Sequence, residues 1–203
     1  AWRMLGKATH ATVLLAGEGA KVFAVSTRPR FLEMEAAKFE DYLKEEGLLA
    51  AQQLRRQKGE SAAKSREMYA KFAKTYVVSG RPDRAYAQAL GLKIEFIPQS
   101  DPAALKPGDE LPVQVLFEGR PLADVQVEVA ISADPRRKSL HKIVGCTNSR
   151  GEIRVPISQA GKLRLHCVHM QRVAQPTHDW ESSWASFTFE VAGAPSPASD
   201  VVS

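Results

Sequence analysis

The second half of the chain alternates apolar and polar residues with a period of two. This alternation is clearest over residues 93–96, 111–117 and 125–130. Successive side chains of a β-strand point to opposite faces, so the pattern predicts half-buried strands. Further strands, separated by turn sequences rich in Gly, Pro, Asn and Asp, are predicted over residues 140–147, 152–157, 162–170 and 183–191. About seven short strands with regular turns are typical of an antiparallel β-sandwich.

The middle of the chain follows a helical period instead. Only one of the twelve prolines, Pro82, falls between Phe31 and Leu92. Helices are predicted over residues 36–46, 48–58 and 62–73, and Gly47 stands where a glycine ends the first of them. A Met and aromatic stripe at helical spacing is typical of a face packed in a core. The helices are therefore expected to pack on the sandwich through Phe39, Tyr42, Leu43, Met68, Tyr69 and Phe72.

The two ends of the chain differ from the rest. Two β-branched apolar runs, residues 12–16 and 21–26, flank Gly17-Glu-Gly19 and predict a β-hairpin. Because a lone hairpin is only marginally stable, we expect either the end of an incomplete first β domain or an appendage to the helical segment and the sandwich. Residues 193–203, rich in Pro, Ala and Ser, are predicted to be disordered.

The predicted fold class is therefore α+β, with an antiparallel β-sandwich as its main domain. The predicted segments are a hairpin over residues 1–30, a helical segment over 31–91, the sandwich over 92–192 and a tail over 193–203.

The composition is that of a globular chain, and the sequence gives no sign of nucleic-acid binding or of a transmembrane segment. With 203 residues, 44% hydrophobic and 25% charged, the chain can bury a core without disulfides or metals. The net charge of +5 reflects basic residues between Arg55 and Arg84, which is typical of a solvated helical face. No nucleic-acid-binding motif accompanies them, and no apolar run reaches transmembrane length. The chain opens with Ala1 and lacks a signal-peptide pattern, so a processed or truncated chain is expected.

One local cluster contains metal-ligating residue types, namely His166-Cys-Val-His169. Strand alternation puts Cys167 and His169 on one face and His166 on the other, so the three cannot converge without a bulge. Two interpretations remain open. His169 either forms a structural hydrogen bond to a neighbour or joins the next, acidic loop in a divalent metal site made of His169, His178, Asp179 and Glu181.

Cysteine and tryptophan positions raise two further questions. Cys146 and Cys167 are the only cysteines, and the parity of their strands predicts that both face the sandwich interior. They would form a disulfide if their Cα atoms lie within about 7 Å, and are otherwise two buried free thiols. Trp184 lies on the parity opposite to Ala185 and Phe187, so it is expected to point outward and pack against the helical segment.

No catalytic motif is present in the sequence. A Gly-x-Ser-x-Gly elbow, a His-Glu-x-x-His helix and a P-loop are all missing, and the chain is therefore not expected to be an enzyme.

Several turn and strand sequences resemble known families. Gly119-Arg-Pro-Leu before one strand and Thr147-Asn-Ser-Arg-Gly151 before another resemble the prealbumin-like or carboxypeptidase-regulatory-like sandwich, with Asn148 in place of the usual Asp. The wider set is similar to a bacterial family of unknown function grouped with the NikM-like periplasmic component of nickel and cobalt uptake systems. The segments that carry this likeness are residues 39–48, 66–74, 91–98, 168–170 and 179–191.

The resemblance implies an extracytoplasmic, periplasmic accessory or binding protein associated with nickel or cobalt uptake, with membrane transport components as partners. Family members carry a His near the mature N-terminus, ahead of a first β domain, and no residue of this sequence matches it. The alternative is a structural sandwich that binds a protein or a glycan and has no metal role. A cell-wall hydrolase is a third, weaker class.

Overall fold

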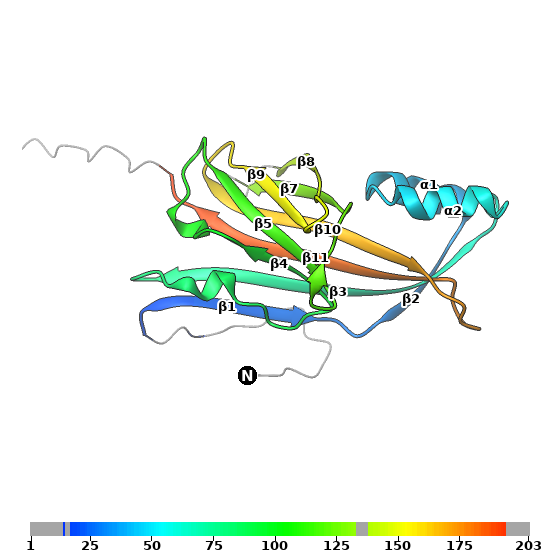
Figure 1. Ribbon diagram of the computed structural model, residues 1–203, viewed down its shortest axis with the longest axis horizontal. Helices are drawn as coiled ribbons and strands as arrows, with labels where there is room; N and C mark the ends of the chain where they lie inside the picture. The colour runs from blue at the N-terminus through cyan, green and yellow to red at the C-terminus, as the bar shows by residue number, and fades with distance from the viewer. Residues whose placement is uncertain (1–13, 15–16, 133–137, 194–203) are drawn as a thin grey trace, which may run out of the picture.

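Two β-sheets packed face to face form the protein, and a pair of helices lies at one end of the larger sheet (Figure 1). The structure is a computed structural model that describes residue 14, residues 17–132 and residues 138–193. No helix within these residues is long and apolar enough to span a bilayer.

The large sheet has seven strands in the order β1-β3-β11-β10-β7-β8, with β2 also paired to β3. β11 runs parallel to β3, whereas the other pairs of this sheet are antiparallel. Its strands are β1 (Gly19–Ser26), β2 (Arg30–Met34), β3 (Ser65–Ser79), β7 (Gln126–Ser132), β8 (Leu140–Cys146), β10 (Gly161–Arg172) and β11 (Trp180–Val191).

The small sheet has four strands, ordered β4-β5-β6 with β9 also paired to β5. These strands are β4 (Ile94–Pro98), β5 (Glu110–Phe117), β6 (Arg120–Pro121) and β9 (Glu152–Pro156). The helices are α1 (Ala36–Glu45) and α2 (Leu49–Gln57), with the short 3-10 helices η1 (Arg84–Ala87) and η2 (Pro102–Ala104) flanking β4 in the chain.

The main core lies between the inner faces of the two sheets. Alternate residues of the strands point into it, as the period of two predicted, and a sandwich-like fold is confirmed. The sandwich is not confined to residues 92–192, because β1, β2 and β3 belong to its larger sheet and Ala20 and Tyr76 to its core. Among the fully buried side chains are Ile94, Phe96, Val113, Val115, Val127, Leu163, Leu165 and Phe187.

The two sheets differ in length. β3 has 15 residues and β10 and β11 have 12 each, whereas the strands of the small sheet have two to eight. The long strands therefore continue past the small sheet toward α1 and α2 (Figure 1). The helices cover the outer face of this extension, where Phe39 and Leu43 pack on Val168 and Trp180. Its inner face is left outside the sandwich core.

The helix predictions over residues 36–46 and 48–58 are confirmed, including the role of Gly47. Gly47 has a φ of +68° and follows the last turn of α1. Its N–H bonds to the carbonyl of Lys44, and the N–H of Leu48 bonds to that of Leu43. This pair of bonds is the Schellman motif that ends a helix. A Cβ at Gly47 would also lie 2.5 Å from the Gln126 side chain, so only glycine fits between α1 and β7.

The third predicted helix, residues 62–73, is wrong, because Ser65–Ser79 forms strand β3. Pairing with β1 and β2 on one side and β11 on the other overrides the local helical pattern. The residues expected on one helical packing face therefore lie on two different faces of the large sheet. Phe39 and Leu43 are buried beneath the helices, whereas Met68 and Phe72 lie on the opposite, inner face of the large sheet.

The predicted N-terminal hairpin is only partly within the described residues. Residues 21–26 form most of β1, as predicted, while residues 12–16, apart from residue 14, lie outside the description. β1 pairs with β3 along its whole length, from Gly19 opposite Ser79 to Ser26 opposite Phe72. It is thus a strand of the sheet that also contains β7, β10 and β11. The predicted disordered tail, apart from residue 193, also lies outside the description.

A buried ion pair connects the two sheets. The Lys74 ammonium on β3 donates to Glu95 Oε2 on β4 at 3.0 Å and to the carbonyls of Gln88 and Phe96 at 3.0 and 3.1 Å. Both side chains are 1–2% exposed, and desolvation lowers the pKa of Lys74. Because every donor of the ammonium has an acceptor, the pair fixes the position of β4 against β3.

Replacing Phe39 with Ala tests whether the helix pair is docked through its buried face. Phe39 is fully buried, so Phe39→Ala should lower the free energy of unfolding by about 3–5 kcal/mol through lost apolar burial and a residual cavity. Chemical denaturation measures this change. Leu49→Ala on α2, where the side chain is 64% exposed, is the control and should change it by less than about 0.5 kcal/mol. Equal effects of the two variants would contradict the docking.

Candidate functional site

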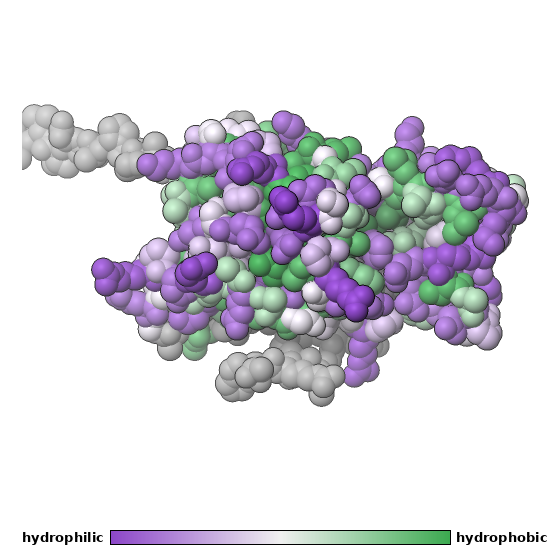
Figure 2. Space-filling view, in the orientation of Figure 1, coloured by the Kyte–Doolittle hydropathy of each residue, from purple (hydrophilic) through white to green (hydrophobic). Residues whose placement is uncertain are grey.

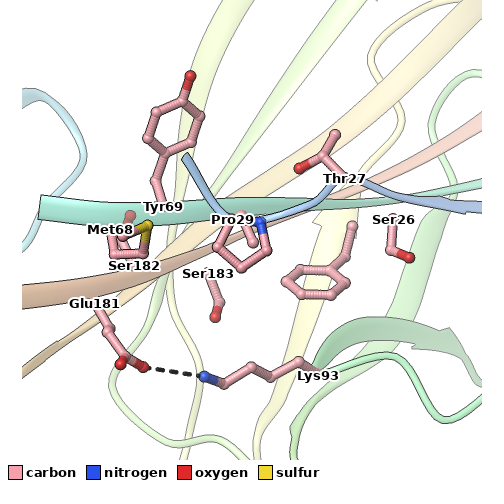
Figure 3. A pocket seen from close by; sticks show the side chains of 11 residues that line it. Ser26, Thr27, Pro29, Met68, Tyr69, Lys93, Glu181, Ser182 and Ser183 are labelled. Atoms are coloured by element: carbon pink, nitrogen blue, oxygen red, sulfur yellow. Dashed lines mark hydrogen bonds and ion pairs between the residues drawn. The ribbon is translucent and has the colours of Figure 1, made fainter. Parts of the chain in front are cut away.

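A groove opens on the inner face of the large sheet, where that sheet runs past the small one (Figure 3). We call it the inner groove; its volume is about 300 Å³. Met68, Ala70 and Phe72 are alternate residues of β3 and lie on one face of it. They line the groove together with Ser183 of β11. The remaining lining residues are Ser26, Thr27, Pro29, Tyr69, Lys93, Glu181 and Ser182. The groove is thus mainly apolar and has charged groups at one side.

A chain of polar contacts stands at that charged side. Lys93 Nζ lies 3.4 Å from Glu181 Oε2, the contact drawn in Figure 3. His178 Nε2 lies 3.4 Å from the other carboxylate oxygen, and the Thr177 hydroxyl lies 2.9 Å from His178 Nδ1. The hydrogen bond from His178 and the charge of Lys93 lower the pKa of Glu181. Glu181 is therefore ionised, while Lys93 stays 35% exposed beside the open groove.

His169 stands near this chain but does not join it. It lies opposite Ser183 in the β10–β11 pairing, so both side chains point to the inner face of the sheet. The imidazole packs on Phe117, with 4.4 Å between ring centroids. Burial and the charge of Lys93 lower the pKa of His169, which keeps the ring neutral at pH 7.

The Asp179 carboxylate is bound by arginine side chains. Arg66 donates two hydrogen bonds of 3.0 Å to its two carboxylate oxygens, and Arg172 lies 3.7 Å away. The hydrogen bonds from Arg66 lower the pKa of Asp179. A carboxylate held by two guanidinium groups is a structural link between β3, β10 and the loop before β11 rather than a free metal ligand.

The four residues proposed as a metal site are therefore not brought together. His178 and Glu181 are in contact, whereas Asp179 turns to Arg66 and His169 packs on Phe117. Over residues 17–132 and 138–193, no group of three or more His, Cys, Asp or Glu side chains is placed to hold a metal ion.

The proposed disulfide is not formed, and both cysteines are free. A bulge in the pairing of β7 with β8 leaves Val144 without an opposite residue and reverses the alternation beyond it. Cys146 consequently shares a face with Gln126 and is exposed, whereas Cys167 is buried. Strand β7 also lies between β8 and β10, so two strand spacings of about 4.8 Å each separate the two cysteines. That separation exceeds the reach of a disulfide.

A second groove, of about 330 Å³, lies on the outer face of the large sheet beside the end of α1. Trp184 forms part of it and stacks on Tyr42, with ring centroids 5.7 Å apart and planes 5° apart. The prediction that Trp184 points outward and packs on the helices is confirmed. Both carboxylates of this outer groove contact an imidazole, since Glu46 lies 3.1 Å from His166 and Glu128 lies 2.6 Å from His141.

A buried polar cluster lies between the helices and the outer face of the sheet. The Tyr42 hydroxyl, at 3.3 Å, and the Ser182 hydroxyl donate to Glu67 Oε1. Glu67 Oε2, Ser65 Oγ and Trp180 Nε1 are buried without a hydrogen-bond partner among the described residues. Burial raises the pKa of Glu67. The helices thus cover a carboxyl group whose ionised form is poorly stabilised.

Sequence reasoning found part of the inner groove and missed the rest. His178 and Glu181 belong to the loop that the sequence places beside the strand end carrying His169, and these two side chains do meet, although His169 packs on Phe117 instead. Lys93 was interpreted only as the polar member of an alternating strand, and no local signal distinguishes it from other exposed lysines. Met68 and Phe72 were assigned to a helical core face, and reading residues 65–79 as a strand would have placed both on one face.

Comparison with known proteins identifies a family. The family model described as Domain of unknown function (DUF4198) matches residues 4–171 of the chain. Comparisons with the curated proteins and with the solved structures gave no match.

The buried position of Glu67 generates a test by pH. The pKa of Glu67 is raised in the folded state. The free energy of unfolding therefore falls as the pH rises through that pKa and the buried carboxyl ionises. Glu67→Gln, which cannot ionise, should therefore melt at a higher temperature than the wild type above pH 7. The difference should shrink as the pH falls toward about 4, where a carboxyl in the unfolded chain is also protonated.

Thermal unfolding at several pH values measures this difference. Glu190→Gln, at an exposed position of β11, controls for the loss of one negative charge. A Glu67→Gln variant that is less stable than the wild type at high pH would show that the buried carboxyl is well accommodated as an anion.

Proposed function

The chain belongs to the DUF4198 family, domains of unknown function, and we propose that it is a non-enzymatic, extracytoplasmic binding protein whose ligand occupies the inner groove. The observation that carries this proposal is the groove itself, an apolar hollow with one charged side. Small-molecule sites typically combine apolar walls with a few placed polar groups, and a volume of about 300 Å³ is at the lower end of their range. The extracytoplasmic location rests on the family resemblance of the turn and strand sequences.

The lining of the inner groove favours an amphipathic, anionic ligand. Met68, Phe72 and Pro29 offer contacts to an apolar body. Lys93 is one-third exposed and lies 3.4 Å from Glu181, which is longer than the about 2.7–2.9 Å of a strong charge-assisted hydrogen bond. Its ammonium can therefore turn toward an anionic group of the ligand. The hydroxyl of Ser183 adds one neutral hydrogen-bonding group.

A part in nickel or cobalt uptake, with membrane transport components as partners, is the second candidate function. The contact between His178 and Glu181 favours it, because imidazole and carboxylate are both ligands of divalent transition metals. His169 lies on the same face of the large sheet. The remaining alternative is a prealbumin-like sandwich that presents its surface to a protein or a glycan, and it predicts that the chain binds neither an amphipathic anion in the groove nor a metal.

Binding of anilinonaphthalene sulfonate, an apolar ring system with one anionic group, tests the first proposal. We expect saturable fluorescence enhancement by the wild-type chain. Lys93→Met removes the cation but keeps an apolar stem, and should raise the Kd about tenfold through loss of one charge-assisted contact. Ala70→Leu should also weaken binding, since the larger side chain fills the floor. Lys162→Met, at an exposed position of β10, is the matched control. Wild-type affinity in the two groove variants would reject the proposal.

Calorimetric titration with Ni²⁺ and Co²⁺ tests the second candidate. A metal held by His178 and Glu181 predicts stoichiometric heat that is lost in His178→Ala and retained in Asp179→Asn, since Asp179 is bound to Arg66. Competition with Lys93 for Glu181 predicts tighter metal binding in Lys93→Met. If the wild-type chain shows no heat of binding, these residues hold no metal.

A further inference from the structure

Strand β8 ends the large sheet on the side away from β1, and within the described part of the chain no strand pairs with its free edge. Its inner neighbour is β7, from Gln126 opposite Cys146 to Ile131 opposite Leu140. The other edge of β8 therefore presents backbone N–H and C=O groups to solvent. Such an edge is a template on which another strand can pair.

Two large apolar side chains are exposed on this edge strand. Leu140 is 61% exposed and Ile143 is 56% exposed, and alternation places them on opposite faces of the strand. Native edges are usually blunted by lysines, inward-pointing charges, proline, bulges or a covering element. Of these, β8 has Lys142 and the bulge at Val144, and the bulge lies near one end and leaves Leu140 to Ile143 in regular pairing.

The charged side chains of residues 138–146 are all basic. Lys138, His141 and Lys142 lie within residues 138–146, which contain no acidic residue. Arg164 lies two strands further in, on β10, opposite Ala130 of β7, which is also the partner of His141. Glu128, on the neighbouring strand β7, is hydrogen-bonded to His141 at 2.6 Å. A second copy of β8 would bring two basic strands together, which is unfavourable.

We propose that the free edge of β8 binds an extended, acidic segment of a partner protein as an added β-strand. Backbone hydrogen bonds to β8 supply affinity, and the alternation of the added strand supplies specificity. One face of the added strand carries carboxylates beside Lys142, and its opposite face carries apolar side chains that contact Ile143. This surface is separate from the inner groove, and the inference does not depend on what the groove binds.

The test uses the full chain and a fluorescein-labelled peptide as long as β8, seven residues, that alternates Glu and Val. Fluorescence anisotropy should show saturable binding, whereas a peptide that alternates Lys and Val should bind at least about tenfold more weakly because its charge matches that of β8. Hydrogen exchange should slow at the amides of residues 140–146 when the Glu-Val peptide is added. Equal affinity for both peptides, or protection confined to other strands, would overturn the proposal.

Two substitutions at exposed positions of β8 complete the test. Lys142→Glu should weaken the Glu-Val peptide about tenfold, and Ile143→Ser should weaken it through lost apolar contact. Lys106→Glu, in the turn before β5, makes the same charge change away from β8 and should leave the affinity unchanged. Unchanged binding in Lys142→Glu contradicts the proposal. So does sedimentation that shows a dimer lost in Ile143→Ser, because a second copy would then occupy the edge.

Discussion

The mismatch in length between the two sheets determines the arrangement of the rest of the molecule. β3, β10 and β11 run past the small sheet, and both faces of their extension lie outside the sandwich core. α1 and α2 cover the outer face with Phe39 and Leu43. The inner face stays open as the inner groove, and hydrophobic residues reach the surface between the sandwich and the end that carries α1 and α2 (Figure 2). The groove thus follows from the fold, and its charged side depends on Lys93, which precedes β4 of the small sheet.

Two buried carboxyl groups show how differently the sandwich and the helical cover are built. Glu95 accepts hydrogen bonds from Lys74 and from the backbone N–H groups of Leu90 and Gly91, so its charge is well compensated. Glu67, beneath the helices, has hydroxyl donors on one oxygen and no partner for the other among the described residues. A fully satisfied pair fixes one packing, whereas a partly satisfied group reduces the stability of its surroundings. The charge of Glu95 is therefore compensated within the sandwich, whereas ionisation of Glu67 beneath the helices is not fully compensated.

Sequence patterns predicted most strands of the two sheets and both helices, because period and turn residues are local signals. They failed at residues 62–73, where Met68, Phe72 and Tyr76 are spaced four apart and so fit one face of a helix or one face of a strand equally well. Only pairing with β1, β2 and β11 decides between the two. They also failed at Cys146, because the bulge at Val144 reverses the alternation. Gly145, whose φ is +146°, is the residue that could have indicated it, since a glycine inside a strand often marks a bulge. The contact between His178 and Glu181 could be foreseen, since they are three positions apart, but Lys93 reaches Glu181 from just before β4, 88 positions away in the sequence.

The central claim is that the inner groove is the ligand site of this protein. Chemical-shift mapping of the isotope-labelled full chain during titration with anilinonaphthalene sulfonate tests it most directly, because it locates the ligand without changing any residue. The account predicts that the largest shifts fall on Met68, Ala70, Phe72, Lys93 and Ser183, which line the groove. Shifts confined to Arg164, His166 and Ser186 of the outer groove would contradict the account.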